Sequence, residues 1–175
     1  MKKILCIIAL VFCTFALFAQ ETKIPQMLEL VQIEENDVEF EVVNIPQDGQ
    51  NHYWFNVGTM GFGDQIFQIQ LDPLSHLYIP LGDTLAEAIS KMEELQDLFN
   101  GTPGTSLFVD GCLTMLYPND KLEQVKVSYY KPLLTRKLEF SIQQEDFLRA
   151  AYISRANFNT LMKGLNFYQK IHPNE

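Results

Sequence analysis

The sequence has little cysteine and, beyond its first residues, no long hydrophobic run. Cys6 and Cys13 fall in an N-terminal apolar segment, so the rest of the chain has Cys112 alone. One cysteine cannot form an intramolecular disulfide, which excludes a fold held together by disulfides. No later apolar run approaches the roughly 20 residues that a membrane-spanning helix needs. We therefore expect stability to come from a hydrophobic core, and no membrane span after the leader.

The N-terminal segment has the three parts of a secretory signal peptide. Lys2 and Lys3 form a basic start, an uncharged apolar run of 15 residues follows, and Ala19 offers a small residue for cleavage. This run is shorter than a membrane-spanning helix. We predict a signal peptide of bacterial style at residues 1–19, cleavage before Gln20, and export to the periplasm or the cell exterior.

Residues 20–175 are long enough for one α+β domain with a substantial core, in which residues 20–36 are a candidate for a loosely ordered lead-in. Loss of the two leader lysines leaves 11 basic against 22 acidic residues, a net charge of −11. The charge is uneven, at −14 over residues 20–119 and +3 over residues 120–175. An acidic surface repels phosphate backbones, so no nucleic acid partner is expected.

The stretch WFNVGTMGFGD, residues 54–64, has three glycines in six residues but lacks the features of a phosphate-binding loop. Ile66 stands where a dinucleotide fingerprint needs its third glycine, and no Gly-Lys-Ser/Thr follows. A strand is expected next, so no helix N-terminus is available to hold an anion. We interpret the stretch as a glycine-rich hairpin or bulged connection, with Met60 and Phe62 either in the core or held out as contact tips.

Patterns for metals and for catalysis are also missing. His52, His76 and His172 lie far apart without zinc-like spacing, so we expect no metal and no cofactor. Cys112 lies in an apolar strand, which favours a buried inert thiol over a nucleophile. The many carboxylates do not single out a glycosidase pair. A secreted hydrolase that uses Cys112 or a carboxylate pair is the alternative function, but no catalytic residue can be named.

Short strand patterns are abundant. Residues 38–42, VEFEV, alternate apolar and acidic side chains with the period of a half-buried strand. Other segments are rich in aromatic or β-branched residues and bounded by Gly, Pro or Asp. We expect strands at residues 27–31 (with an ordered lead-in as the alternative), 38–42, 52–57, 65–71, 76–79, 107–116 (bulged or bent at Asp110-Gly111), 122–130, 137–142 and 147–153, the last also compatible with a helix.

Two helices are expected. Thr84 and Glu87 form a capping box before an apolar stripe that extends to Phe99. Ser154 is the expected N-cap of the second helix, before a second stripe. Gly164 lies inside that helix, where glycine costs roughly 1 kcal/mol, so we expect another group to approach it closely.

Runs of strands with two helices indicate an α+β fold: an antiparallel sheet with two helices packed on one face. The segments 69–79 and 142–153 each begin with Ile-Gln and end with Tyr-Ile before a helix. This similarity suggests a duplicated ββ(β)α unit, with coincidence as the alternative. In such an arrangement the opposite face of the sheet is free to bind a ligand.

Consecutive aromatics in the strands must point to opposite faces. Alternation places Trp54 opposite Tyr53 and Phe55, and separates Tyr129 from Tyr130. One set fills the core, while the other lies on the open face, where Tyr and Trp often mark interfaces. We therefore predict an exported, non-catalytic binding module for a protein or small-molecule ligand. The candidate contact residues are Tyr53, Trp54, Met60, Phe62, Tyr129 and Tyr130.

Overall fold

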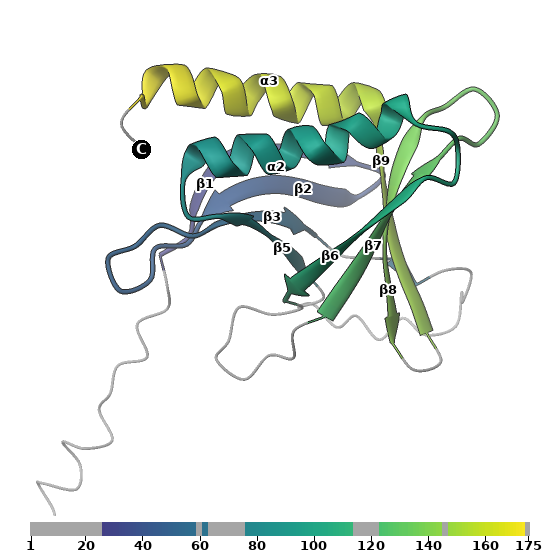
Figure 1. The fold of residues 1–175 in the computed structure, drawn as a ribbon, viewed down its shortest axis with the longest axis horizontal. Helices are drawn as coiled ribbons and strands as arrows, with labels where there is room; N and C mark the ends of the chain where they lie inside the picture. Colours follow the sequence, from purple (N-terminus) through teal and green to yellow (C-terminus); the bar gives the residue numbers. More distant parts are fainter. Residues whose placement is uncertain (1–25, 59–60, 63–75, 114–122, 145–146, 174–175) are drawn as a thin grey trace, which may run out of the picture.

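The computed structural model describes residues 26–58, 61–62, 76–113, 123–144 and 147–173. These segments form two antiparallel sheets and two long helices (Figure 1). The α+β class with antiparallel strands is thereby confirmed. The predicted signal peptide and the strand expected at 65–71 lie outside the described residues.

The first sheet has four strands in the order β1-β2-β3-β5. Its strands are β1 (Leu28–Glu35), β2 (Val38–Asn44), β3 (Tyr53–Val57) and β5 (Leu77–Gly82). A two-residue turn joins β1 to β2, with Asn36 at φ 53° and Asp37 at φ 63°. Asn and Asp tolerate this left-handed conformation better than other residues with side chains, so the local sequence suits a tight hairpin.

The second sheet has five strands in the order β4-β9-β8-β7-β6. Its strands are β4 (Gly61–Phe62), β6 (Ser106–Cys112), β7 (Glu123–Tyr130), β8 (Lys137–Gln144) and β9 (Phe147–Ser154). The expected bulge in β6 is present, because the register shifts between Val109 and Cys112 and Gly111 has φ 76°. Strand β9 pairs with β8 along its whole length, so the helical reading of 147–153 was wrong.

Helix α2 (Leu85–Asp97) begins at the predicted capping box. The Thr84 hydroxyl accepts a hydrogen bond from the Glu87 amide at 3.2 Å, and the Glu87 carboxylate accepts one from the Thr84 amide at 3.1 Å. A 3₁₀ turn (Leu98–Asn100) ends the helix before Gly101. The predicted apolar stripe is buried in the structure: Leu85, Ala88, Ile89, Met92, Leu95 and Phe99.

Helix α3 (Arg155–Ile171) is fixed at its start to the first sheet. Ser154 caps the helix through its hydroxyl. The carboxylate of Glu35, the last residue of β1, accepts hydrogen bonds from the Ser154 amide at 2.6 Å and from Asn157 Nδ2 at 3.0 Å. A Cβ atom at Gly164 would lie 2.5 Å from Cγ2 of Val31 in β1. The predicted close approach at Gly164 is therefore confirmed.

One hydrophobic core connects both sheets and both helices. The Phe55 ring, from the first sheet, lies 5.5 Å from the Phe140 ring of the second sheet and 6.3 Å from the Phe158 ring of α3. Phe99, beyond α2, contacts both Phe158 and Tyr129. In Figure 1 the two helices run side by side above the first sheet, with the second sheet at the right. Helix α2 contacts β5 and β3, and α3 contacts β1 and β9.

The strands divide into two sheets, where the sequence suggested one. Among the described residues, a single isolated bridge links Tyr78 of β5 to Leu113 beyond β6, with two backbone hydrogen bonds of 2.8 and 3.0 Å. One bridge pair does not make a continuous ladder, so the sheet is interrupted there. Each half still has the order of consecutive strands followed by one helix. That order is what a duplicated unit predicts, and duplication stays a hypothesis.

The glycine-rich stretch carries the chain from one sheet to the other. The Gly58 amide donates to the Glu39 carbonyl at 2.7 Å, within the first sheet. Gly61 and Phe62 then pair with Ala150 and Arg149 of β9 in the second sheet. The described part of the stretch therefore connects the first sheet to the second, and the residues that would complete a hairpin after Phe62 lie outside the described residues.

Candidate binding surface on the second sheet

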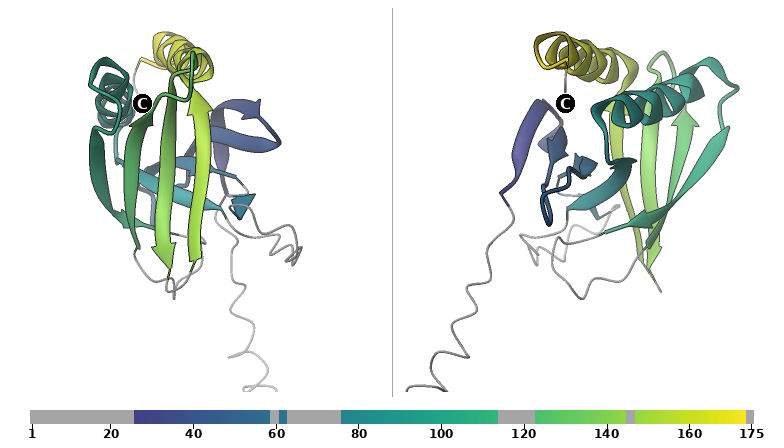
Figure 2. Two further views of the ribbon diagram at one scale, coloured as in Figure 1. Left: turned by 90° about the vertical axis from the view of Figure 1, so that its right-hand side faces the viewer. Right: turned by 60° about the vertical axis from the view of Figure 1, so that its left-hand side comes forward.

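The outer face of the second sheet is open. In β7, Val125, Val127 and Tyr129 point into the core, so the alternate residues point outward. Figure 2 (left) shows this sheet from outside, and no described element lies in front of its central strands. Both helices instead lie over the core, on the other side of these strands.

Three aromatic side chains are exposed on this face: Phe108 of β6, Tyr130 of β7 and Tyr152 of β9. Their relative exposures are 56%, 48% and 37%. The rings of Tyr130 and Tyr152 lie 5.9 Å apart at an interplanar angle of 50°. We call Phe108, Tyr130 and Tyr152 the aromatic face.

Tyr152 is fixed in place by a carboxylate on the neighbouring strand. Its hydroxyl donates to Glu139 Oε1 at 3.0 Å, and the two residues are register partners. Burial, followed by the hydrogen bond and the negative charge of Glu139, raises the pKa of Tyr152 to about 12. Tyr152 is therefore protonated at physiological pH and acts as a donor, and its ring is held at a defined position on the face.

Polar side chains surround the aromatic face. Lys126 is exposed on β7, and Glu139 on β8 is half-buried. Ser141 donates its hydroxyl to the Lys126 carbonyl at 3.3 Å. Tyrosine beside small hydroxyl residues is a combination that antibody-type binding surfaces use.

The six predicted contact residues occupy different places. Tyr53 and Tyr129 are buried in the core, and Trp54 is half-buried on the opposite face of the first sheet. Tyr130 is on the aromatic face. Met60 lies outside the described residues, and for Phe62 the described part is its backbone pairing in β4.

Sequence reasoning missed two members of the aromatic face. Tyr152 was not identified because the segment 147–153 was also compatible with a helix. In a helix, side chains do not alternate between two faces, so the face of Tyr152 could not be assigned. Once the segment is a strand, buried Ala151 and Ile153 place Tyr152 outward. Phe108 lies between the more buried Leu107 and Val109, so the same alternation would have identified it.

Cys112 does not have the surroundings of a nucleophile. Its side chain is fully buried in the core, and its sulfur donates a weak hydrogen bond to the Val109 carbonyl. Burial is the main cause that raises the pKa of this thiol to about 12. A protonated, inaccessible thiol supports the structural role that the sequence favoured.

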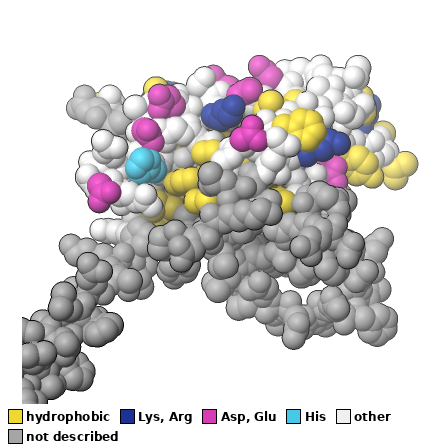
Figure 3. Space-filling view, turned by 60° about the horizontal axis from the view of Figure 1, so that its bottom comes forward, with side chains coloured by type: hydrophobic (Ala, Val, Ile, Leu, Met, Phe, Trp, Pro, Cys, Tyr) yellow, Lys and Arg dark blue, Asp and Glu magenta, His cyan; other side chains and the backbone are white. Residues whose placement is uncertain are grey.

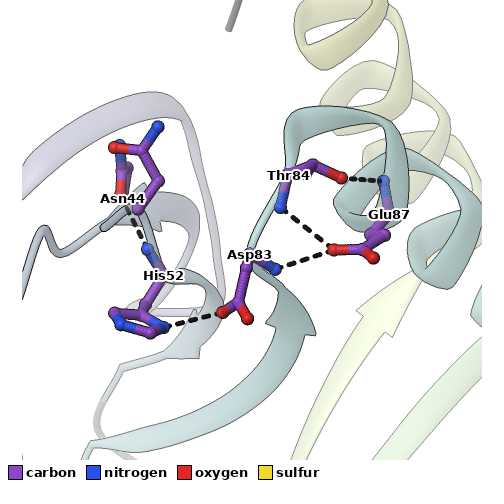
Figure 4. Close-up of polar contacts among 6 residues, drawn as sticks. Asn44, His52, Asp83, Thr84 and Glu87 are labelled. Carbon is purple, nitrogen blue, oxygen red and sulfur yellow. Dashed lines mark hydrogen bonds and ion pairs between the residues drawn. The ribbon is translucent and has the colours of Figure 1, made fainter. Parts of the chain in front are cut away.

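A polar network joins the first sheet to the start of α2 (Figure 4). His52 Nδ1 lies 2.7 Å from Asp83 Oδ1, and the His52 amide donates to Asn44 Oδ1 at 3.2 Å. The nearby Thr84 hydroxyl already caps the Glu87 amide. These hydrogen bonds connect a loop to the N-terminus of a helix, which is a structural role. A catalytic triad would need a free nucleophile beside the histidine.

A buried carboxylate lies on the opposite face of the first sheet from the core. Glu41 Oε1 accepts a hydrogen bond of 2.6 Å from Asn56 Nδ2, and Asn56 Oδ1 lies 3.2 Å from His76 Nδ1. Burial raises the pKa of Glu41, and the nearby Glu29 and Glu39 add to this effect, while the Asn56 hydrogen bond opposes it. No sequence pattern indicated this row of polar side chains, since it depends on the pairing of β2 with β3.

The hollows beside α2 in the described part of the chain are open and do not enclose a site. Two open depressions lie beside α2, one near Gly82 and Lys91 and one against α3 near Gln96 and Arg155. In the described part of the chain, no group of three His, Cys, Asp or Glu residues is placed to hold a metal ion. Neither described helix has the length and apolarity to cross a bilayer. Comparisons with protein-family models, curated proteins and solved structures found no match to this chain.

Proposed function

We propose that this protein is an exported, non-catalytic binding module that holds a protein partner on the aromatic face of its second sheet. The observation that carries the proposal is the exposure of Phe108, Tyr130 and Tyr152 on a face that no described element covers. Adjoining exposed aromatic side chains often mark an interaction site, and the rings of Tyr130 and Tyr152 lie side by side. Export is supported by the signal-like N-terminal segment.

A protein partner fits this face better than a small molecule. Small ligands are generally held in concave pockets that bury most of their surface. The aromatic face is part of a sheet, its Tyr152 is held by Glu139 of the neighbouring strand, and the ring of Tyr130 packs beside that of Tyr152. Rigid tyrosines on a surface supply large contact area at low entropic cost, which is how protein-binding surfaces use them.

Site-specific photo-crosslinking tests the proposal in the source organism. A photoreactive phenylalanine analogue at position 152 is expected to crosslink to one defined protein of the cell envelope. The matched control places the same analogue at Phe167, which is 64% exposed on α3. No adduct from position 152, or the same adduct from both positions, would contradict the proposed face.

A further inference from the structure

The loop between β7 and β8 holds two leucines almost entirely in solvent. Leu133 and Leu134 are 94% and 96% exposed. The loop projects beyond the second sheet at the upper right of Figure 1, and Figure 3 shows hydrophobic side chains protruding at the right-hand end, with basic side chains and an acidic one next to them. Nearly all of the surface of both leucines faces water, so packing within the protein does not account for apolar residues at these positions.

The backbone of this turn is closed in a way that keeps both leucines outside. The Thr135 amide and hydroxyl both donate to the Pro132 carbonyl, each at 3.0 Å. Leu133 and Leu134 therefore occupy the central positions, where Gly, Asn and Asp are usual. Leu133 has φ 52°, a left-handed conformation that is unfavourable for leucine. A strained backbone and exposed leucines do not stabilise the fold. Strain that is kept without such a benefit points to a functional contact with another molecule.

The charges around the tip are basic, in a chain that is otherwise acidic. Lys131 and Arg136 flank the leucines and are exposed. The Arg155 amide donates to the Arg136 carbonyl at 2.9 Å, so the start of α3 adds another base at this end. The segments 98–109, 124–138 and 149–173 contain no Asp or Glu. Nearby Lys137 contacts Glu35, whose carboxylate is already engaged at the N-terminus of α3.

We propose that this tip, Lys131–Arg136, docks the protein on an anionic lipid bilayer. Two leucines on a convex turn are too small for a stable protein interface, which needs about 800 Å² on each partner. They suit insertion below the headgroups, while Lys131 and Arg136 bind anionic headgroups with their long side chains. An apolar insertion joined to a basic patch supplies the two signals that reversible membrane binding requires.

This inference concerns a surface next to the aromatic face but separate from it. Tyr130 ends β7 immediately before Lys131, so a docked tip would hold the aromatic face beside the membrane surface. A partner at that face would then be a protein close to the same membrane. The docking itself does not depend on such a partner.

Vesicle co-sedimentation tests the docking. The chain from Gln20 onward is used, because it contains every described strand and helix and lacks the apolar leader, which would bind lipid by itself. Vesicles contain either phosphatidylglycerol and phosphatidylcholine in equal parts or phosphatidylcholine alone. We expect at least tenfold stronger partition onto the anionic vesicles, and a decline of that partition at high salt.

Three variants separate the contributions. Leu133→Ser/Leu134→Ser should reduce partition onto anionic vesicles at least tenfold, and Lys131→Gln/Arg136→Gln should reduce it severalfold. Leu133→Gly should also weaken partition while the melting temperature stays equal or rises, because glycine accepts φ 52° without strain. That pair of results distinguishes lost docking from lost folding.

The matched control is Phe167→Ser/Ile171→Ser, which removes two exposed apolar side chains from α3. Its partition should equal that of the unmodified chain. Absence of binding to anionic vesicles, equal loss in the control, or undiminished binding of Leu133→Ser/Leu134→Ser would each overturn the proposal. A protein crosslinked from position 134 without any vesicle binding would assign the tip to a protein partner instead, and would equally overturn it.

Discussion

Replacement of Gly164 by alanine tests the contact between α3 and the edge strand of the first sheet. Within a helix, alanine is favoured over glycine by roughly 1 kcal/mol, so the substitution would stabilise an exposed helix. Here the new Cβ would lie 2.5 Å from Val31 Cγ2 and 3.4 Å from Val31 Cβ. The first distance is about 1 Å shorter than an optimal carbon–carbon contact.

The strand cannot easily move away from the helix. Val31 is β-branched and stiff at χ1, and Glu35 ties the end of β1 to the first turn of α3 through two hydrogen bonds. Overpacking of this kind costs about 1–3 kcal/mol. After the helix gain of roughly 1 kcal/mol is subtracted, we expect Gly164→Ala to destabilise the protein by up to about 2 kcal/mol, which lowers the melting temperature by a few degrees.

A double-mutant cycle with Val31 tests whether the close contact is the cause. The free energy of unfolding is measured by urea denaturation with circular dichroism. In a Val31→Ala background the 2.5 Å contact is gone and the 3.4 Å contact is ordinary. Gly164→Ala should then stabilise the protein by about 1 kcal/mol, so its effect changes sign between the two backgrounds. Equal destabilisation in both backgrounds would refute the close approach as the reason for glycine.

Two carboxylates give predictions of opposite sign with pH. Hydrogen bonds from Ser154 and Asn157, with the charge of Lys137, outweigh burial and lower the pKa of Glu35. The ionised Glu35 therefore stabilises the fold above pH 4.5, and this stabilisation is lost as pH falls through the lowered pKa. Glu35→Gln should lower the free energy of unfolding by about 1.5–3 kcal/mol at neutral pH, and by less in acid. Urea denaturation at several pH values measures this difference. The pKa of Glu41 is raised, so its contribution declines as pH rises above 4.5. Glu41→Gln keeps an acceptor for Asn56 and should gain stability relative to the unmodified chain as pH rises, and an unchanged difference across pH would contradict the buried carboxylate.

Local sequence patterns were sufficient for the helices and most of the strands. The capping box at Thr84 and the N-cap at Ser154 are interactions within a few residues, so their geometry follows from the sequence itself. Alternation likewise separated Trp54 from Tyr53 and Phe55, and the structure places the last two in the core. These features depend on neighbours along the chain, which a sequence displays directly.

Features that depend on distant partners were not predictable. Alternation separates Tyr129 from Tyr130, but the core formed with Phe99 decides which of them is buried. The division into two sheets arises because β5 and the segment after β6 are joined by the isolated Tyr78–Leu113 bridge and not by a continuous ladder. Gly164 indicated that something approaches the helix, and only the packing of β1 identifies it as Val31. Long-range pairing is set by the whole core, so no local pattern encodes it.

The aromatic face is tested most directly by the affinity of the protein crosslinked from position 152. Titration calorimetry compares the unmodified chain, Tyr130→Ser/Tyr152→Ser, and the control Phe167→Ser/Ile171→Ser, after equal folding is checked by circular dichroism. If the aromatic face is the binding surface, loss of both of its tyrosines should weaken binding by about 2 kcal/mol or more, close to thirtyfold, and the control should bind normally. Equal affinity for all three chains would contradict the proposed binding surface.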